Sequence, residues 1–250
     1  MKLTLQDPRF LKDSITIISE LVNEVTISVD KTKLEIIAMD PANVAMIVFK
    51  LLNSAFTDYV IEDPKQLSVS LEHLKQMLRR AKPTDTLTLE LDEEKNRLKV
   101  LLKGETTRRF NLSLLDHSEG EHKVPPLEFP VKIETNTLLL NEAIEDMDII
   151  SDSLSFIVDG TDKFVIQSEG NLASGKVEIT TDQETDILNS TGDLVKSNYS
   201  IEYLKKIIKG GKLSNTTIIQ FGPDYPLRVE YRILDKLSLV SILAPRTANT

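Results

Sequence analysis

The sequence repeats itself at an offset of about 130 residues, and this duplication limits the possible folds more than any other feature. Residues 70–78 (SLEHLKQML) align with residues 200–208 (SIEYLKKII). Three further pairs of segments match in the same order: 11–15 with 140–144, 25–30 with 154–159, and 98–102 with 227–231. Four ordered matches at one offset indicate a tandem duplication, and 250 residues are enough for two domains.

Both halves carry the same order of helix and strand signals. A short strand (2–5, and again 131–134) precedes an amphipathic helix, which follows Asp7-Pro8 in the first half and covers about 137–147 in the second. In the first half, alternating segments at 25–29, 34–36 and 44–48 predict strands, and a second helix is expected over about 71–82. The apolar positions of the first helix are Phe10, Leu11, Ile15, Ile18 and Leu21. This order predicts an α+β fold with helices on one face of the sheets.

Residues 118–130 separate the two halves. This segment holds three prolines and no helical period, which is typical of an extended connector. We therefore expect domains at 1–117 and 131–250, joined by a connector at 118–130. Val124, Leu127 and Phe129 give the connector apolar side chains that can make contacts.

The sequence lacks the signatures of an enzyme. It contains no cysteine and only three histidines, so disulfides and thiolate or histidine metal sites are not expected. Phosphate-binding, dinucleotide-binding, zinc-protease and serine-hydrolase motifs are absent. No apolar run approaches the roughly 18–20 residues that a membrane span needs. We expect no catalysis, no cofactor, no metal and no membrane partner.

One acidic cluster leaves an alternative open. A metal-dependent DNA hydrolase could use carboxylates of this cluster, but their spacing spreads them around a helix and its exit. A solvated or salt-bridging face is therefore the preferred interpretation. The members are Glu142, Glu145, Asp146, Asp148 and Asp152.

Basic residues are concentrated on the predicted helices, although the net charge is −9. Lys75, Arg79 and Lys82 are spaced i, i+4 and i+7, which places them on one stripe of the second helix. The second half repeats this spacing in Lys205, Lys209 and Lys212; Lys206 and Lys12 add to it. A solvated lysine-rich face is the alternative. Its repetition in both halves of an acidic chain favours a surface that contacts phosphates.

Five short motifs resemble those of a known family. They are residues 38–41 (AMDP), 70–75 (SLEHLK), 104–108 (GETTR), 229–231 (VEY) and 243–246 (LAPR). In this order they resemble the sliding clamps of the proliferating cell nuclear antigen (PCNA) family, and the archaeal members look closest. The resemblance covers essentially the whole chain, whereas bacterial clamps have three repeats in a longer chain.

The resemblance implies a DNA sliding clamp, a non-enzymatic processivity factor for replication and repair. Three chains would close into a homotrimeric ring, with sheets outside and helices facing duplex DNA without reading its sequence. A clamp loader would open the ring, and peptides of DNA polymerases, ligases and nucleases would bind it. The location would be cytoplasmic, at the nucleoid of an archaeon, or nuclear in a eukaryote. The alternative is a clamp paralogue that acts only as one subunit of a heterotrimer.

The family also implies two protein-binding surfaces. At the subunit interface, a basic end would meet an acidic end, and the edge strand around 107–112 would pair with that around 175–180. The basic end is Arg80, Lys82, Arg108 and Arg109, and the acidic end is Glu142 and Asp146. Lys82 is thus assigned to both the DNA-facing and the interface set. An apolar pocket under the connector would receive client peptides, lined by Met39, Asn43, Val44, Met46, Val124, Pro125, Pro226, Leu243, Ala244 and Pro245.

Overall fold

A computed structural model describes residues 1–116 and 122–246, which fall into two compact units. The first unit comprises residues 1–41, 47–116, 122–124 and 233–239, and the second comprises 42–46, 125–232 and 240–246. Each unit therefore includes a short segment from the other half of the sequence. The domain boundaries at 117/118 and 130/131 stay a prediction, because His117 and connector residues 118–121 lie outside the described residues.

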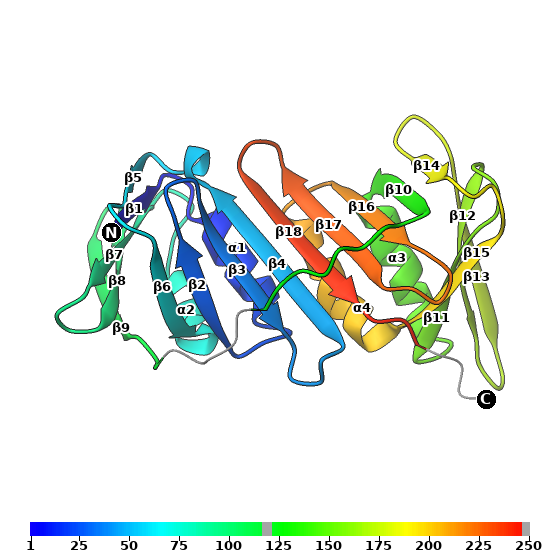
Figure 1. The fold of residues 1–250 in the computed structure, drawn as a ribbon, viewed down its shortest axis with the longest axis horizontal. Coiled ribbons are helices and arrows are strands. Elements are labelled where there is room, and N and C mark those ends of the chain that lie inside the picture. Colours follow the sequence, from blue (N-terminus) through cyan, green and yellow to red (C-terminus); the bar gives the residue numbers. More distant parts are fainter. Residues whose placement is uncertain (117–121, 247–250) are drawn as a thin grey trace. The chain divides into compact units, whose positions relative to one another are not determined.

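The first unit combines antiparallel strands with two helices (Figure 1). One sheet has the order β5-β1-β7-β8-β9, and strands β4, β3, β2 and β6 lie side by side in a second sheet. The elements are β1 (Lys2–Leu5), α1 (Arg9–Ile18), β2 (Glu24–Val29), β3 (Lys33–Met39), β4 (Ala45–Leu52), η1 (Asn53–Ala55), β5 (Asp58–Val60), β6 (Lys65–Ser70), α2 (Leu71–Leu78), β7 (Thr86–Asp92), β8 (Arg97–Lys103) and β9 (Thr107–Ser113).

The second unit repeats this plan. One sheet has the order β13-β12-β11-β15, and strands β14, β10, β16, β17 and β18 lie side by side in another. The elements are β10 (Val131–Asn136), α3 (Thr137–Asp148), β11 (Ser153–Val158), β12 (Lys163–Glu169), β13 (Ser174–Thr180), β14 (Asp186–Asn189), β15 (Val195–Ser200), α4 (Ile201–Ile207), η2 (Ile208–Lys212), β16 (Thr216–Phe221), β17 (Leu227–Ile233) and β18 (Leu237–Leu243). The predicted α+β class and the duplication are confirmed.

Helix α1 begins where Asp7 and Pro8 predict. The Asp7 carboxylate accepts the Arg9 backbone N–H at 3.0 Å, and Pro8 has the helical φ of −67°. The apolar face of α1 is buried, packs against α2, and lies behind strands β3 and β4 in Figure 1. Helix α3 packs against α4 in the same way, and equivalent positions match in burial: Ile15 and Ile144 are both 0% exposed.

Aromatic rings fill the core of the second unit. Phe156 contacts the rings of Phe164, Tyr199 and Phe221 at centroid distances of 5.0, 5.5 and 5.9 Å. All four side chains are 0% exposed. Removing one such ring typically costs about 3–5 kcal/mol, so this cluster holds the two sheets of the unit together.

Two helices end earlier than the sequence predicts. Helix α2 ends at Leu78, not near residue 82, because the N–H groups of Arg80 and Ala81 bond three residues back and Pro83 blocks a further turn. Helix α4 ends at Ile207 and continues as the 3₁₀ segment η2. Gly210 there leaves room for the Tyr231 ring, since a Cβ at residue 210 would lie 2.2 Å from Tyr231 Cδ2. The prediction of a second helix over about 71–82 is wrong at its C-terminal end, and Lys82 lies beyond the helix.

Candidate functional site

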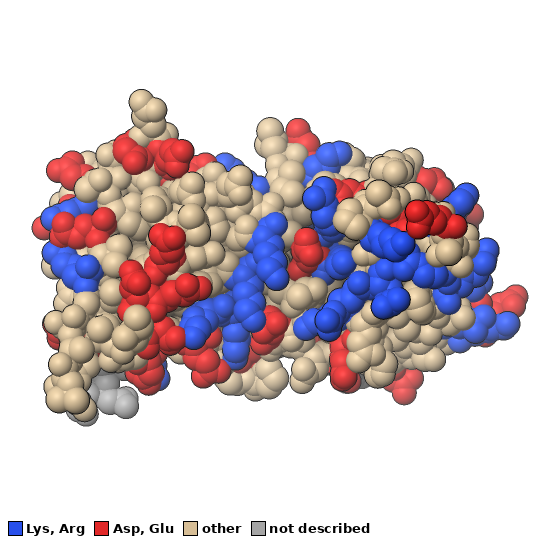
Figure 2. Space-filling view, turned by 180° about the vertical axis from the view of Figure 1, so that it is seen from behind, with Lys and Arg blue, Asp and Glu red and all other residues tan. Residues whose placement is uncertain are grey.

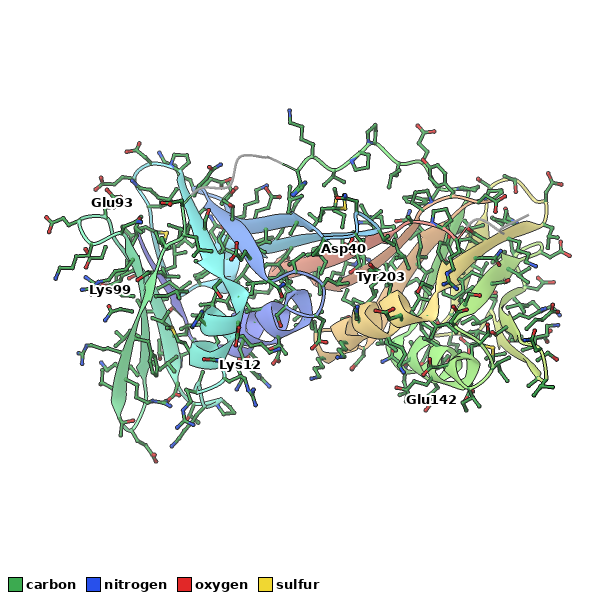
Figure 3. All side chains as sticks on the ribbon, turned by 90° about the horizontal axis from the view of Figure 1, so that it is seen from below. Lys12, Asp40, Glu93, Lys99, Glu142 and Tyr203 are labelled. Atoms are coloured by element: carbon green, nitrogen blue, oxygen red, sulfur yellow. The ribbon has the colours of Figure 1, made fainter. Side chains whose placement is uncertain are left out.

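The basic residues of the first unit gather around α1 and α2. Lys75 lies in the last turn of α2, Arg79 follows as its C-cap, and Lys82 lies beyond the helix. Lys12 extends from α1 and donates to the Ala81 carbonyl at 3.0 Å, which ties α1 to the turn that follows α2. Figure 2 shows blue groups over this helix-bearing face, and Figure 3 labels Lys12 among the helices. The Lys82 ammonium lies 3.3 Å from Glu105 in an exposed ion pair.

The basic residues of the second unit lie on α4 and η2. Lys205 and Lys206 are in the last turn of α4, whereas Lys209 and Lys212 are on the 3₁₀ segment. Lys205 Nζ lies 2.5 Å from Asp148 Oδ2 at the end of α3. Lys206 Nζ lies 2.9 Å from Glu202 Oε1 and 5.0 Å from the Tyr203 ring centroid. Lys205 and Lys206 are therefore each paired with a carboxylate.

Helix α3 is the acidic counterpart. It carries no lysine or arginine, and Glu142 and Asp146 are both exposed. Figure 3 places Glu142 on the outer side of the helix layer, pointing away from the strands. The helix therefore offers negative charge for contact with another molecule and no cation for phosphates.

A buried carboxylate, Asp85, organises the end of α2. Its side chain is only 2% exposed and accepts the Lys82 backbone N–H at 2.6 Å. The Arg108 guanidinium forms an ion pair with Asp85 and also donates to the Arg80 carbonyl at 2.5 Å. Arg108 is thus bound within its own unit, whereas the sequence predicted it to bind a neighbouring subunit. Arg80 and Arg109 remain exposed.

Asp85 makes the end of α2 sensitive to acid. The Lys82 N–H, and then Arg108, hold the pKa of the Asp85 carboxyl below its ordinary value. A depressed carboxyl pKa stabilises the fold above the unfolded-state value of about 3.9, and that stabilisation disappears as pH falls through the folded-state value. We expect Asp85→Asn to lower the urea midpoint of unfolding at pH 7. The difference in midpoint between the variant and the wild type should become smaller below about pH 4. A constant gap from pH 7 to pH 3 would contradict this role.

The two strands predicted to pair between subunits are both at the edge of a sheet. β9 pairs with β8, and β13 pairs with β12; each lies at one end of its sheet order among the described strands. Both have alternating exposed residues. Unpaired backbone groups on such edges are ready templates for another strand.

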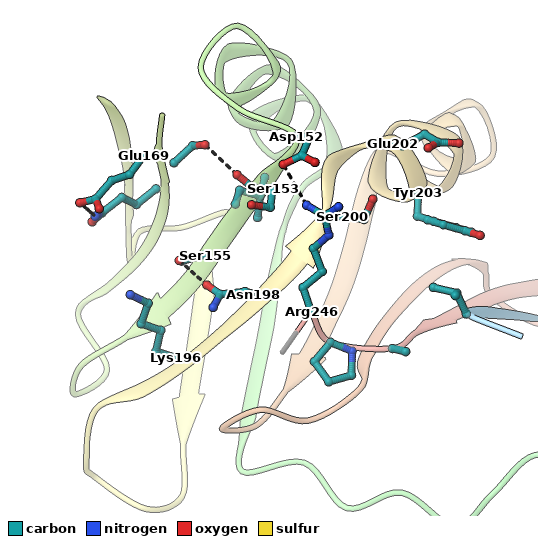
Figure 4. Close-up of a pocket in the computed structure, with 16 residues that line it drawn as sticks. Asp152, Ser153, Ser155, Glu169, Lys196, Asn198, Ser200, Glu202, Tyr203 and Arg246 are labelled. Carbon is teal, nitrogen blue, oxygen red and sulfur yellow. Dashed lines mark hydrogen bonds and ion pairs between the residues drawn. The ribbon is translucent and has the colours of Figure 1, made fainter. Parts of the chain in front are cut away.

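A polar cavity of about 960 Å³ lies in the second unit (Figure 4). Serine, asparagine and glutamine residues of β11, β12 and β15 line it, together with the C-terminal arm 244–246. The Arg246 guanidinium lies 2.9 Å from Asp152 Oδ1, and the Arg246 N–H donates to the Asn198 carbonyl at 2.7 Å. The hydrogen bond from Arg246 lowers the pKa of Asp152.

The ten residues predicted for the client pocket are divided between the units. Met39 and Val124 belong to the first, and the other eight belong to the second. The Ala244 N–H donates to the Val44 carbonyl at 2.9 Å, and these two residues line the polar cavity with Pro245. Met46 and Leu243 are buried, so their side chains belong to the core. Val124 is 45% exposed, and Asn43, Pro125, and Pro226 are exposed to varying degrees.

Sequence reasoning missed Asp85, whose side chain holds Arg108, and it did not predict that Asp148 pairs with Lys205. The acidic cluster contained Asp148, but no signal linked it to a lysine 57 residues away. Within residues 1–116 and 122–246, no group of histidine, aspartate and glutamate has the geometry of a metal site. The same residues contain no helix long and apolar enough to span a membrane.

Comparison with known proteins covers the whole chain. The model of the PCNA N-terminal domain matches residues 1–119, and the model of the PCNA C-terminal domain matches residues 123–246. A protein named DNA polymerase sliding clamp from Nanoarchaeum equitans is 35% identical over 99% of this chain and 100% of its own length. A protein of the same name from Pyrococcus furiosus is 33% identical over 91% of this chain and 91% of its own length.

Solved structures agree with these matches. PCNA from Thermococcus kodakaraensis has a TM-score of 0.91 at 26% identity, and covers 98% of this chain and 99% of its own. A chain of the PCNA2–PCNA3 complex from Sulfolobus tokodaii has a TM-score of 0.87 at 27% identity, with the same coverage. With both domain models matched in order, this chain belongs to the proliferating cell nuclear antigen family.

Proposed function

We propose that the chain is a DNA sliding clamp, which encircles duplex DNA and holds replication and repair enzymes on it. The observation that carries this proposal is the gathering of lysine and arginine on the helices of both units, in a chain of net charge −9 (Figure 2). Relatives named DNA polymerase sliding clamp, similar over nearly the whole chain, support it. The location would be cytoplasmic, at the DNA.

The helical cations would contact phosphates rather than bases. Such contacts provide affinity without sequence information, which a protein that moves along DNA requires. Because fields of exposed charges fade over about 8 Å at physiological salt, local cations can act despite the acidic remainder of the surface. The proposed contacts are Lys12, Lys75, Arg79, Lys82, Lys205, Lys206, Lys209 and Lys212.

The mechanism would be topological. In a closed ring of three copies, DNA cannot leave sideways, so each phosphate contact can be weak enough to permit sliding. No step needs a catalytic group or a cofactor. A clamp loader would supply the energy that opens the ring.

Ring closure would join unlike surfaces of neighbouring copies. Edge strand β9 of one chain would add to β13 of the next, and Arg80, Lys82 and Arg109 would approach Glu142 and Asp146. This arrangement covers both free edges and pairs opposite charges, which favours the correct register. Arg108 would support it indirectly, since it holds the Arg80 carbonyl.

Client enzymes would dock through short peptides. Val124 and Pro125 are exposed apolar residues of the connector, and Pro245 lies in the C-terminal arm. A peptide with apolar and aromatic anchors would bury these groups and gain backbone hydrogen bonds along the connector. DNA polymerases, ligases and nucleases are the expected clients.

Removing helical lysines tests the DNA-facing proposal. We expect a triple variant, Lys75→Ala, Lys205→Ala, Lys209→Ala, to weaken binding to a labelled duplex and to reduce the salt dependence of that binding. Each lost phosphate contact lowers the slope of log K against log salt by roughly 0.9. The matched control, Lys31→Ala, Lys95→Ala, Lys123→Ala, makes the same charge change at exposed positions outside the helices. Equal slopes for both triple variants would show that the stripe is a solvated face.

A second candidate is a clamp subunit that assembles only with paralogues. The similarity to a chain of a PCNA2–PCNA3 complex favours it specifically. The native mass of the purified chain separates the candidates. A mass of three copies supports the homotrimer, whereas a monomer or dimer that closes into a ring only with a second clamp protein supports the paralogue.

A further inference from the structure

The lysines proposed to face DNA differ in whether a carboxylate of the same chain forms an ion pair with them. In the second unit, Lys205 Nζ is 2.5 Å from Asp148 Oδ2, in a pair whose side chains are 48% and 39% exposed. In the first unit, the equivalent lysine is Lys75, by the alignment of residues 70–78 with 200–208. Across residues 1–116 and 122–246, the structure gives no ion pair to Lys75 or to Arg79.

The duplication explains this difference. Counting on from the matched segments 11–15 and 140–144, Asp148 corresponds to Ser19. Burial supports the alignment, since Ile18 and its counterpart Met147 are both buried. Ser19 is neutral, and its hydroxyl donates to the Thr16 carbonyl at 2.7 Å. At this position the first unit has the hydroxyl of Ser19, whereas the second unit has the carboxylate of Asp148, which binds Lys205.

We propose that Asp148 competes with DNA phosphate for Lys205, so that Lys205 contacts DNA more weakly than its counterpart Lys75 in the first unit. This inference rests on the proposed contact between the helical lysines and DNA. Lys205 must exchange one anionic partner for another before it contacts a phosphate, whereas Lys75 has no carboxylate to release among the residues that the structure describes. Asp148 also places a negative charge within about 8 Å of the site, where salt screens it least.

The size of the effect follows from the exposure of the pair. An exposed ion pair typically changes an equilibrium constant by about 1.5- to 5-fold. Competition of this size does not abolish the contact at Lys205, but it makes the two units unequal. In a ring, one contact weakened in this way in each chain would loosen the hold on DNA, which suits sliding.

Reciprocal substitutions at the two equivalent positions test the proposal. Asp148→Ser gives the second unit the residue of the first, and we expect it to raise affinity for a labelled duplex by about 1.5- to 5-fold. Ser19→Asp gives the first unit the residue of the second, and should lower the affinity by a similar factor. Glu94→Ser is the charge-matched control, because Glu94 is exposed in the turn between β7 and β8.

Adding Lys205→Ala to Asp148→Ser shows whether the gain passes through Lys205. We expect the double variant to lose the gain, and Lys205→Ala alone to weaken binding less than Lys75→Ala alone. A gain no larger than that of Glu94→Ser, or one that survives the loss of Lys205, would overturn the inference. If Lys75→Ala and Lys205→Ala both leave binding unchanged, the proposed DNA contact fails instead. Urea midpoints of each variant control for folding.

Discussion

Reversing Glu142 and Asp146 to lysine is expected to convert the ring into separate, folded chains. Both carboxylates are exposed on α3, so their replacement leaves the core of the second unit intact. In the ring they would face Arg80, Lys82 and Arg109 of the next chain, and juxtaposed like charges cost several kcal/mol at an interface. Sedimentation velocity should show the mass of one chain, and high salt should weaken assembly of the wild type.

Two further variants make this result specific. Glu62→Lys, Asp63→Lys makes the same charge change in the exposed loop between β5 and β6, and should sediment as the wild type. Adding Arg80→Glu and Arg109→Glu to the lysine variant restores opposite charges and should restore the trimer. Arg108 is left unchanged because it holds Asp85. A normal trimer from Glu142→Lys, Asp146→Lys would place the interface elsewhere.

Substituting the exposed apolar residues of the connector and arm is expected to abolish client binding. Val124→Asp, Pro245→Ala puts a charge where an apolar anchor would bind and removes a rigid ring that the peptide would contact. Because a few buried anchors carry most of the energy of such interfaces, we expect the affinity for a client peptide to fall at least about tenfold by calorimetry.

The control for this substitution is Val60→Asp. Val60 is 53% exposed on β5, similar to the 45% of Val124, but lies outside the connector. It should leave the peptide affinity unchanged, and all three proteins should form the same ring. Equal affinity for the wild type and Val124→Asp, Pro245→Ala would move the client site away from the connector.

The elements that sequence predicted well are those whose signals are local. Alternation along 25–29 predicts β2 because every second side chain is buried, and Asp7-Pro8 predicts the start of α1 because both act within one turn. The repeat then transfers these predictions to the second unit.

Features that depend on distant contacts could not be predicted. Asp85 and Arg108 are 23 residues apart and meet only after β7, β8 and β9 have paired. The early end of α4 depends on Tyr231 packing over Gly210, which no helix propensity describes. Spacing placed Lys205 on the helix face, but its carboxylate partner comes from α3.

Retention on circular and linear DNA tests the central claim most directly. The clamp is loaded onto a nicked circular plasmid by its clamp loader and then washed in high salt, which screens phosphate contacts over more than about 3 Å at 1 M. An encircling ring should stay on the circle in high salt and slide off once the plasmid is cut at one site. Loss from circle and linear DNA at the same rate would contradict topological enclosure and leave phosphate binding as the only hold on DNA.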